Sequence, residues 1–108
     1  MSKQEKLDET AIAQALSELE GWKREDEKWI VRQYRFPSFR HAVAYVNEVA
    51  EIAEQMNHHP MIAIDFRRIT LRLTTWHAGG LTELDLESAT RYDACYRNGY
   101  AGEQADNP

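Results

Sequence analysis

A long stretch with apolar side chains at helical spacing restricts the folds open to this chain more than any other feature. Between Phe39 and Met56, apolar residues recur every three or four positions and polar residues fill the opposite side, which predicts an amphipathic helix of about five turns. Ser38 is a favourable N-cap for it, and Pro60 cannot continue it. Such a helix gains most of its stability by packing its stripe against another element. The stripe contains Phe39, Ala42, Val43, Val46, Val49, Ala50, Ala53 and Met56.

Two segments after this helix show the alternation of strands with one buried face. They run from about Met61 to Asp65 and from about Arg68 to Thr75, with Phe66 expected in the core between them. The pattern indicates a sheet that is covered on one side and open on the other. The polar side is expected to continue as far as Trp76. In the second strand Ile69, Leu71 and Leu73 share one face, and Thr70, Arg72 and Thr74 share the other.

The rest of the chain adds two helices and a hairpin. A short helix is predicted from about Glu9 to Leu19, and Gly21 is expected to end it. The segments WKRE and KWIVRQYRF, separated by the charged turn DEK, predict a β-hairpin. After a Gly-Gly pair, a last helix is expected to open at Thr82 and continue to about Arg97.

These elements predict an α+β fold with the order α-β-β-α-β-β-α. Neither hairpin can bury a face alone, so we expect one four-stranded antiparallel sheet with three helices packed on one face. Residues 1–108 are expected to form a single domain, in which 1–8 and 99–108 are mobile ends. The other face of the sheet remains available for a pocket, a partner or a second subunit.

The charge balance argues against several classes of function. Thirteen basic and eighteen acidic residues give a net charge of −5, which does not favour nucleic-acid binding. The cluster Arg67, Arg68 and Arg72 is either the solvated side of a strand or a local anion contact. No segment is apolar enough to serve as a signal sequence or membrane span, so a cytoplasmic location is expected. Cys95 is the only cysteine, so one chain cannot form a disulfide.

Adjacent histidines follow the long helix. Glu54 and His58 are four residues apart and can meet on one side of a helix, while His59 must point elsewhere. The two imidazoles are either cationic residues that complement a helix C-terminus or acid–base groups at the rim of a pocket. We assign no metal ligands, because a third ligand would have to come from His77, His41 or a carboxylate without a recognisable spacing.

Three further candidate residues, Trp76, His77 and Asp85, lie on either side of the Gly-Gly pair. Trp76 is either an exposed aromatic for a dimer contact or a flat wall for a planar ring. Asp85 is either part of a capping box at the start of the last helix or a catalytic group. His77, next to Trp76 on an extended strand, is expected to face the opposite side of the sheet.

The spacing of these residues resembles that of the pterin-4a-carbinolamine dehydratase family. The segments NHHP, ITLRLTT and GLTELD are similar to segments of that family, and the match is strong from Phe39 to about Tyr92. The spacing is Glu54, three residues, His58-His59-Pro60, five residues, Phe66, nine residues, Trp76, eight residues and Asp85.

The resemblance implies an activity. Members of this family are hydro-lyases that dehydrate 4a-hydroxytetrahydrobiopterin, or a related 4a-hydroxytetrahydropterin, to the quinonoid dihydropterin. This step recycles the pterin used by aromatic amino acid hydroxylases, and it requires no metal or redox cofactor. The resemblance also implies a homodimer or homotetramer, and it leaves open a pterin-binding or regulatory module with weak or no activity. Some members act as partners of other proteins, including a homeodomain transcription factor in animals.

The resemblance also implies roles for individual residues. His58 and His59 match the family's histidine pair and would share the proton transfers, with Glu54 orienting His58. One departure matters, because many members carry a third active-site histidine where this chain has Trp76. Indole does not transfer protons near neutral pH, so the pair is expected to carry more of the chemistry. Residues expected to border the bound pterin are Asn57, Thr74, Thr75, Trp76, His77 and Asp85.

Overall fold

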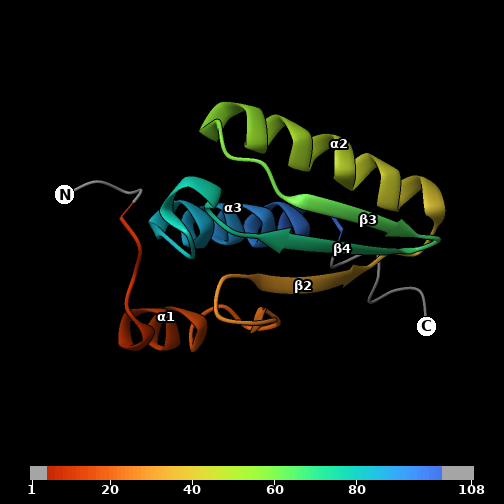
Figure 1. Ribbon diagram of the computed structural model, residues 1–108. Helices are drawn as coiled ribbons and strands as arrows, with labels where there is room; N and C mark the ends of the chain where they lie inside the picture. Colours follow the sequence, from red (N-terminus) through yellow and green to blue (C-terminus); the bar gives the residue numbers. More distant parts are fainter. Residues whose placement is uncertain (1–4, 101–108) are drawn as a thin grey trace.

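The computed structural model describes residues 5–100, which form a four-stranded antiparallel sheet with three helices on one face (Figure 1). The strand order is β1-β2-β4-β3, so β1 and β3 are the edge strands. The predicted fold class and the element order are both confirmed. The elements are α1 (Glu9–Leu16), β1 (Lys23–Arg24), β2 (Ile30–Arg35), α2 (Phe39–Met56), β3 (Met61–Asp65), β4 (Arg68–Leu73), the 3₁₀ turn η1 (Trp76–Ala78) and α3 (Glu83–Gly99).

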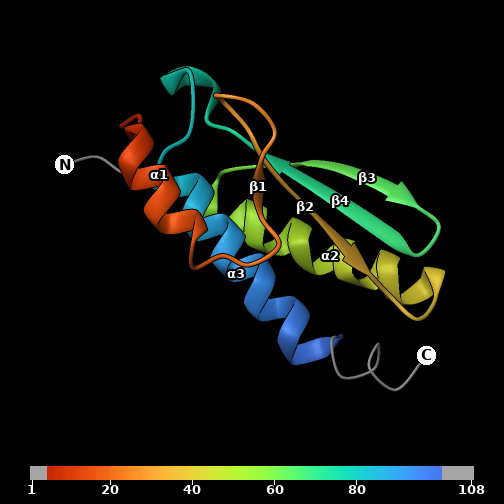
Figure 2. The same ribbon diagram turned by 90° about the horizontal axis from the view of Figure 1, so that it is seen from below.

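The register of the sheet separates a covered face from an open one. Tyr34 of β2 is paired with Ile69 of β4, and Ile69 is paired with Ile64 of β3, so these side chains point to the same face. Helices α2 and α3 run along that face, and α1 lies beside α3 (Figure 2). The alternation predicted for β4 is therefore confirmed. Residues on the open face include Val31, Gln33, Ala63, Thr70 and Arg72.

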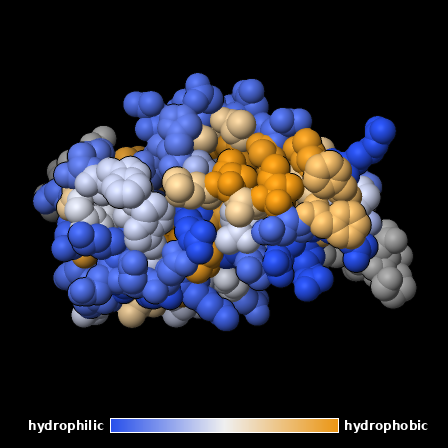
Figure 3. All heavy atoms as spheres, turned by 45° about the vertical axis from the view of Figure 1, so that its right-hand side comes forward, coloured by the Kyte–Doolittle hydropathy of each residue, from blue (hydrophilic) through white to orange (hydrophobic). Residues whose placement is uncertain are grey.

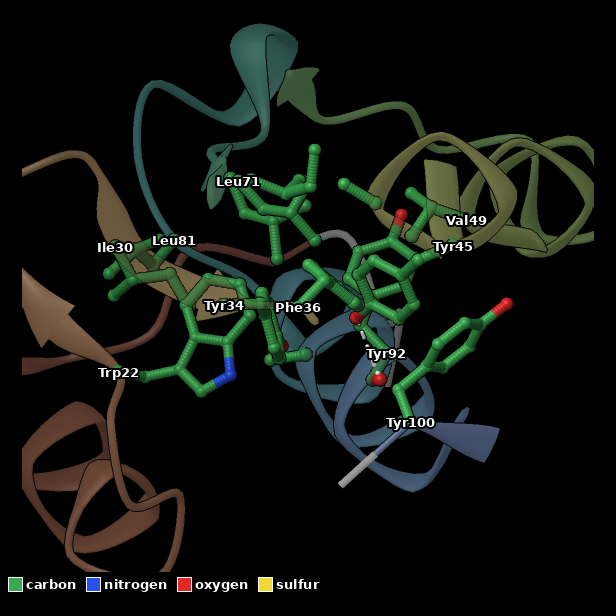
Figure 4. Close-up of a cluster of buried hydrophobic side chains, with 14 of the residues drawn as sticks. Trp22, Ile30, Tyr34, Phe36, Tyr45, Val49, Leu71, Leu81, Tyr92 and Tyr100 are labelled. Atoms are coloured by element: carbon green, nitrogen blue, oxygen red, sulfur yellow. Dashed lines mark hydrogen bonds between the residues drawn. The ribbon is translucent and has the colours of Figure 1, made fainter. Parts of the chain in front are cut away.

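An aromatic cluster fills the space between the sheet and the helices. Tyr34 and Phe36 from the β2 end meet Tyr45 of α2, and all three rings are at most 2% exposed. Tyr45 was not part of the predicted stripe, although it lies on the buried side of α2. Its hydroxyl donates to the carbonyl of Tyr92 on α3 and so joins the two helices. Figure 4 shows these rings converging with aliphatic side chains from the strands.

Three of the predicted boundaries differ most clearly from the structure. Helix α1 ends at Leu16 rather than Leu19, and Gly21 lies beyond it in a left-handed turn with φ +94°. Strand β1 has only two residues, Lys23–Arg24, so the hairpin is much more uneven than its sequence suggested. Strand β4 ends at Leu73, because the chain turns away before Trp76.

The predicted mobile ends are partly packed. The backbone N–H of Leu7 donates to the carbonyl of Leu81, and Asp8 caps α1 through its side chain. At the other end, Tyr100 is only 7% exposed and its hydroxyl donates to Glu48. These contacts fix residues 7–8 and 100 to the body of the domain. Residue 99 belongs to α3, and residues 1–4 and 101–108 lie outside the described residues.

The basic cluster and the cysteine have structural partners. Arg72 makes a bidentate ion pair with Glu25, both contacts at 2.7 Å, which supports the interpretation of a solvated strand face. Arg67 lies over the ring of Phe66. Partial burial and the nearby Glu48 carboxylate raise the pKa of Cys95 to about 12, so this thiol stays protonated near neutral pH. Within residues 5–100, the helices are too short or too polar to cross a bilayer.

Apolar side chains gather along the β3 edge. Phe66 is 69% exposed, so the prediction that it belongs to the core was wrong. It is the first residue of the two-residue β3–β4 turn and has φ +57°, a left-handed conformation that is strained for an aromatic residue. In Figure 3 the orange surface lies over this edge and the start of α2. We call this surface the β3-edge patch; its exposed members are Phe39, Ile62, Ile64 and Phe66.

A buried carboxylate ties the first hairpin to α3. Asp93 Oδ1 accepts hydrogen bonds from the indole of Trp22, the guanidinium of Arg32 and the hydroxyl of Tyr34. Burial is the main cause that raises the pKa of Tyr34 far above its ordinary value, so this phenol remains a donor. The Arg32 guanidinium supplies the countercharge at 2.8 Å. One side chain of α3 thus accepts hydrogen bonds from three donors in and just before the first hairpin.

Replacing Asp93 tests this role. We expect Asp93→Ala to lower the free energy of unfolding by about 3 kcal/mol, because it leaves buried donors unsatisfied and removes the countercharge of Arg32. Urea unfolding followed by fluorescence measures the change. Glu51→Ala, on the exposed side of α2, is the matched control and should cost less than about 0.5 kcal/mol. Equal effects of the two substitutions would contradict the role assigned to Asp93.

Candidate functional site

The C-terminus of α2 explains how the two histidines come to point in different directions. Asn57 adopts a left-handed conformation with φ 51°, which asparagine tolerates better than most residues. This turn lets the backbone N–H of His58 donate to the carbonyl of Ala53, five residues earlier, as in a Schellman motif. The chain then leaves the helix at Pro60 and enters β3. The sequence NHHP therefore ends the helix and separates the two imidazoles.

His58 turns inward and meets a buried carboxylate. Its Nε2 lies 2.6 Å from Oδ1 of Asp85, and the two residues are 9% and 0% exposed. Because an ionised carboxylate only accepts hydrogen bonds, Nε2 carries the proton and Nδ1 is the remaining ring nitrogen. The ring is thus fixed in orientation and in tautomer.

Asp85 has a second role at the start of α3. Its Oδ2 accepts hydrogen bonds from the backbone N–H of Thr82 and the hydroxyl of Thr75. Thr82 in turn caps the helix through its own hydroxyl, which completes a capping box. The capping interpretation of Asp85 is therefore confirmed, and its other oxygen holds His58. A catalytic role for Asp85 stays a prediction.

The predicted partner of Glu54 was wrong. The resemblance and the spacing of four residues placed Glu54 beside His58, but its Oε2 lies 2.6 Å from Nε2 of His59. The left-handed turn at Asn57 is the cause, since it carries His58 out of the helical register and into the core. The Glu54–His59 pair is exposed, with side chains 74% and 54% accessible. Such a pair contributes little to stability, but it orients the second imidazole.

A pocket of about 370 Å³ lies at this end of the sheet. It contains both histidines and every residue expected to border a pterin except Asp85, which lies behind His58. Pro60 and Met61 also line it, and nothing in the sequence pattern distinguished them from ordinary residues at a strand start. The lining residues are Asn57, His58, His59, Pro60, Met61, Thr74, Thr75, Trp76 and His77.

The turn after β4 forms one wall of this pocket. Trp76 and His77 begin the 3₁₀ turn η1 and both line the pocket, so the prediction that His77 faces the opposite side was wrong. Trp76 is 74% exposed, and its ring contacts the edge of Trp29 with ring centroids 5.1 Å apart. No pattern in the sequence indicated that Trp29, from the first hairpin, supports this wall. Trp76 thus presents a flat apolar surface beside the histidines.

The threonine hydroxyls of the pocket are already engaged. The hydroxyl of Thr74 donates to the carbonyl of Lys28, and that of Thr75 donates to Asp85. The Thr75 hydroxyl also lies 2.8 Å from the hydroxyl of Thr82, so both its donor and an acceptor position are used within the protein. The Thr74 hydroxyl can still accept a hydrogen bond from a ligand. Among the described residues, no group of three or more His, Cys, Asp or Glu is arranged to hold a metal ion.

A larger hollow of about 610 Å³ lies elsewhere, between the segment after α1 and α3. Arg32 and Asp93 line it, but they pair with each other and with their neighbours. It contains none of the histidines. The chemistry of the described residues therefore favours the smaller pocket as the functional site.

Comparisons with known proteins agree with the geometry. The family model described as pterin 4 alpha carbinolamine dehydratase matches residues 5–95. A relative from Thermomicrobium roseum, named "Putative pterin-4-alpha-carbinolamine dehydratase", is 48% identical over 86 residues, which cover 80% of this chain and 91% of the relative. A relative of the same name from Sulfolobus acidocaldarius is 38% identical over 86 residues, which cover 80% of this chain and 93% of the relative.

Solved structures show the same fold. The crystal structure of a transcriptional coactivator/pterin dehydratase from Brucella melitensis has a TM-score of 0.80 and 31% identity, covering 83% of this chain and 97% of that chain. A pterin dehydratase-like protein identified as a RuBisCO assembly factor in the alpha-carboxysome has a TM-score of 0.59 and 21% identity, covering 69% and 88%. This second likeness concerns the fold alone.

The two carboxylate–histidine pairs can be tested separately. We expect Asp85→Asn to remove the fixed tautomer of His58 and leave His59 unchanged, whereas Glu54→Gln should affect only His59. Long-range proton–nitrogen NMR on the imidazole rings reports the protonated nitrogen. Loss of the capping carboxylate should also lower the free energy of unfolding by about 1–2 kcal/mol. A change at His58 caused by Glu54→Gln, with none caused by Asp85→Asn, would contradict the observed pairing.

Proposed function

Because this chain belongs to the pterin-4a-carbinolamine dehydratase family, we propose that it dehydrates a 4a-hydroxytetrahydropterin, with 4a-hydroxytetrahydrobiopterin as the expected substrate. The product is the quinonoid dihydropterin, and the reaction would return the pterin of aromatic amino acid hydroxylases to a reducible form. The observation that carries this proposal is the pair His58 and His59, which line one pocket and are each held by a carboxylate.

The reaction needs two proton transfers and no change of oxidation state. A proton is delivered to the 4a-hydroxyl, the C4a–O bond breaks and water leaves. The proton on N5 is removed, and the electron pair of that N–H bond allows C4a=N5 to form. One proton is given and one is taken, so imidazoles suffice. We therefore assign no metal and no redox cofactor.

The two histidines suit these transfers for different reasons. His58 is buried and fixed by Asp85, so its ring can hold a constant position against the ligand. His59 is exposed and can exchange protons with water, while Glu54 orients its ring. We propose that His58 and His59 act on the ligand directly, and that Asp85 and Glu54 act through them.

The walls of the pocket suit a flat heterocycle. Trp76 offers an exposed ring for stacking, and its edge contact with Trp29 restricts its motion. Asn57 is exposed and can bond to a polar ring edge with both groups of its amide. We propose that the pterin lies against Trp76, with Thr74 accepting a hydrogen bond from one of its N–H groups.

Substitution of each histidine tests the mechanism. We expect His59→Ala and His58→Ala to lower the turnover number on the order of a hundredfold or more, because each removes an acid–base group. Stopped-flow absorbance of 4a-carbinolamine decay, with and without protein, measures the rate. His59 gives the cleaner result, since His58→Ala leaves Asp85 buried without its partner. Unchanged dehydration by both variants would remove the histidines from the mechanism.

A second function, pterin binding or regulation without useful catalysis, is favoured by Trp76 at the position where many family members have a third histidine. The stopped-flow assay separates the two. Tight binding of an oxidised pterin analogue, combined with carbinolamine decay no faster than the spontaneous rate, would decide for the binding module. Acceleration by the wild-type protein would decide for the enzyme.

We also propose that the protein is a homodimer or homotetramer whose contact includes the β3-edge patch. Strand β3 is an edge strand, and its side chains Ile62 and Ile64 are 38% and 45% exposed. An uncovered edge with apolar side chains is a template for pairing with another chain. The strained, exposed Phe66 at the end of the strand is consistent with a residue kept for a contact.

A charge in this patch should prevent self-association. We expect Ile64→Glu to shift the protein to the monomer in sedimentation velocity at micromolar concentration, because the carboxylate would be buried without a partner. Gln33→Glu, on the open face of the sheet, is the matched control and should leave the association state unchanged. A wild-type protein that sediments as a monomer would contradict the proposal.

A further inference from the structure

We propose that His77 is a third acid–base group of the pocket and supplies the proton-transfer capacity that Trp76 lacks. This inference rests on the proposed dehydration. Indole cannot exchange protons near neutral pH, and the family resemblance gave His77 no role beyond bordering the ligand. The structure places Trp76 and His77 in the wall of the same pocket as His58 and His59.

The 3₁₀ turn makes this placement possible. Successive residues of a strand point to opposite faces, whereas successive residues of a 3₁₀ turn are about 120° apart. Neighbouring side chains can therefore reach one cavity. β4 ends at Leu73 and η1 begins at Trp76. Trp76 and His77 therefore have 3₁₀ rather than strand geometry, and their side chains do not alternate between the two faces of the sheet.

The turn is held by its own backbone. The N–H groups of Ala78 and Gly79 donate to the carbonyl of Thr75, and the N–H of Thr75 donates to the carbonyl of Gly80. Gly79 has φ +76°, a conformation that favours glycine and closes the turn. Thr75 itself is only 1% exposed and is bonded to Asp85. His77 thus extends from a closed turn that is anchored to the same carboxylate as His58.

The ring of His77 is available for a ligand. Among the described residues it makes no hydrogen bond, and its side chain is exposed. His58 and His59, in contrast, each commit Nε2 to a carboxylate. His77 can offer either nitrogen to a ligand and can take a proton from water after each turnover.

These properties suit delivery of the proton to the departing hydroxyl. In the proposed step the His77 imidazolium gives its proton to the 4a-oxygen as the C4a–O bond breaks, and the water formed leaves toward solvent. His58 or His59 takes the proton from N5. Bulk water restores both groups, so the catalyst returns to its starting state with no net change in protons.

The test compares His77→Gln with His41→Gln. His41 lies at the start of α2, at the opposite end of that helix from the pocket, where its ring bonds to Ser38. We expect His77→Gln to lower the turnover number by on the order of tenfold to a hundredfold, with the dissociation constant for 7,8-dihydrobiopterin unchanged within about twofold. His41→Gln should match the wild type in both measurements.

A second variant tests whether the lost capacity is acid–base in kind. Trp76→His combined with His77→Gln returns an imidazole to the turn, and it should recover at least about tenfold of the lost rate. A rate for His77→Gln equal to the wild type, or a parallel loss of analogue binding, would overturn the role of His77. Failure of the wild-type protein itself to accelerate carbinolamine decay would instead overturn the proposed dehydration.

Discussion

The buried carboxylate of Asp85 is the constraint on which the site depends. Its two oxygens connect three parts of the chain: His58 after α2, Thr75 after β4 and the start of α3 at Thr82. An ionised group with no exposed surface is costly unless it is fully paired. The positions of His58, Thr75 and Thr82 therefore depend on one another through this carboxylate. The capping of a helix and the orientation of an imidazole are one arrangement here.

The architecture could be predicted from the sequence because periodic hydrophobic patterns indicate which faces are buried. Helix α2 was predicted by its apolar stripe and its Ser38 cap. Strand β4 was predicted by its alternating pattern. Boundaries were less predictable where the chain leaves regular structure. Nothing local distinguishes a two-residue β1 from a longer strand, because its length depends on how the first hairpin packs against Asp93. Phe66 was misplaced for a related reason, since hydrophobicity alone does not separate a core residue from one at an exposed turn.

Most of the residues that line the candidate pocket were predictable, but their connections were not. The spacing of the motif identified both histidines, Glu54 and Asp85. The partner of each histidine depends on the left-handed turn at Asn57, which moves His58 away from Glu54. A helical i, i+4 rule applies only while the helix lasts. Similarly, the position of His77 depended on where β4 ends, and no residue before Trp76 marks that point in the sequence.

The separation of Asp85 from its partner along the chain has a kinetic consequence. His58 and Asp85 are 27 residues apart, and they meet only after α3 has docked against α2 and the β3–β4 hairpin. Non-local contacts of this kind close late, because the loop between them must first lose its conformational freedom. A refolding chain would thus recover helical circular dichroism before it acquires ligand affinity. For the same reason, the pocket is a more sensitive reporter of complete tertiary assembly than any spectroscopic measure of secondary structure.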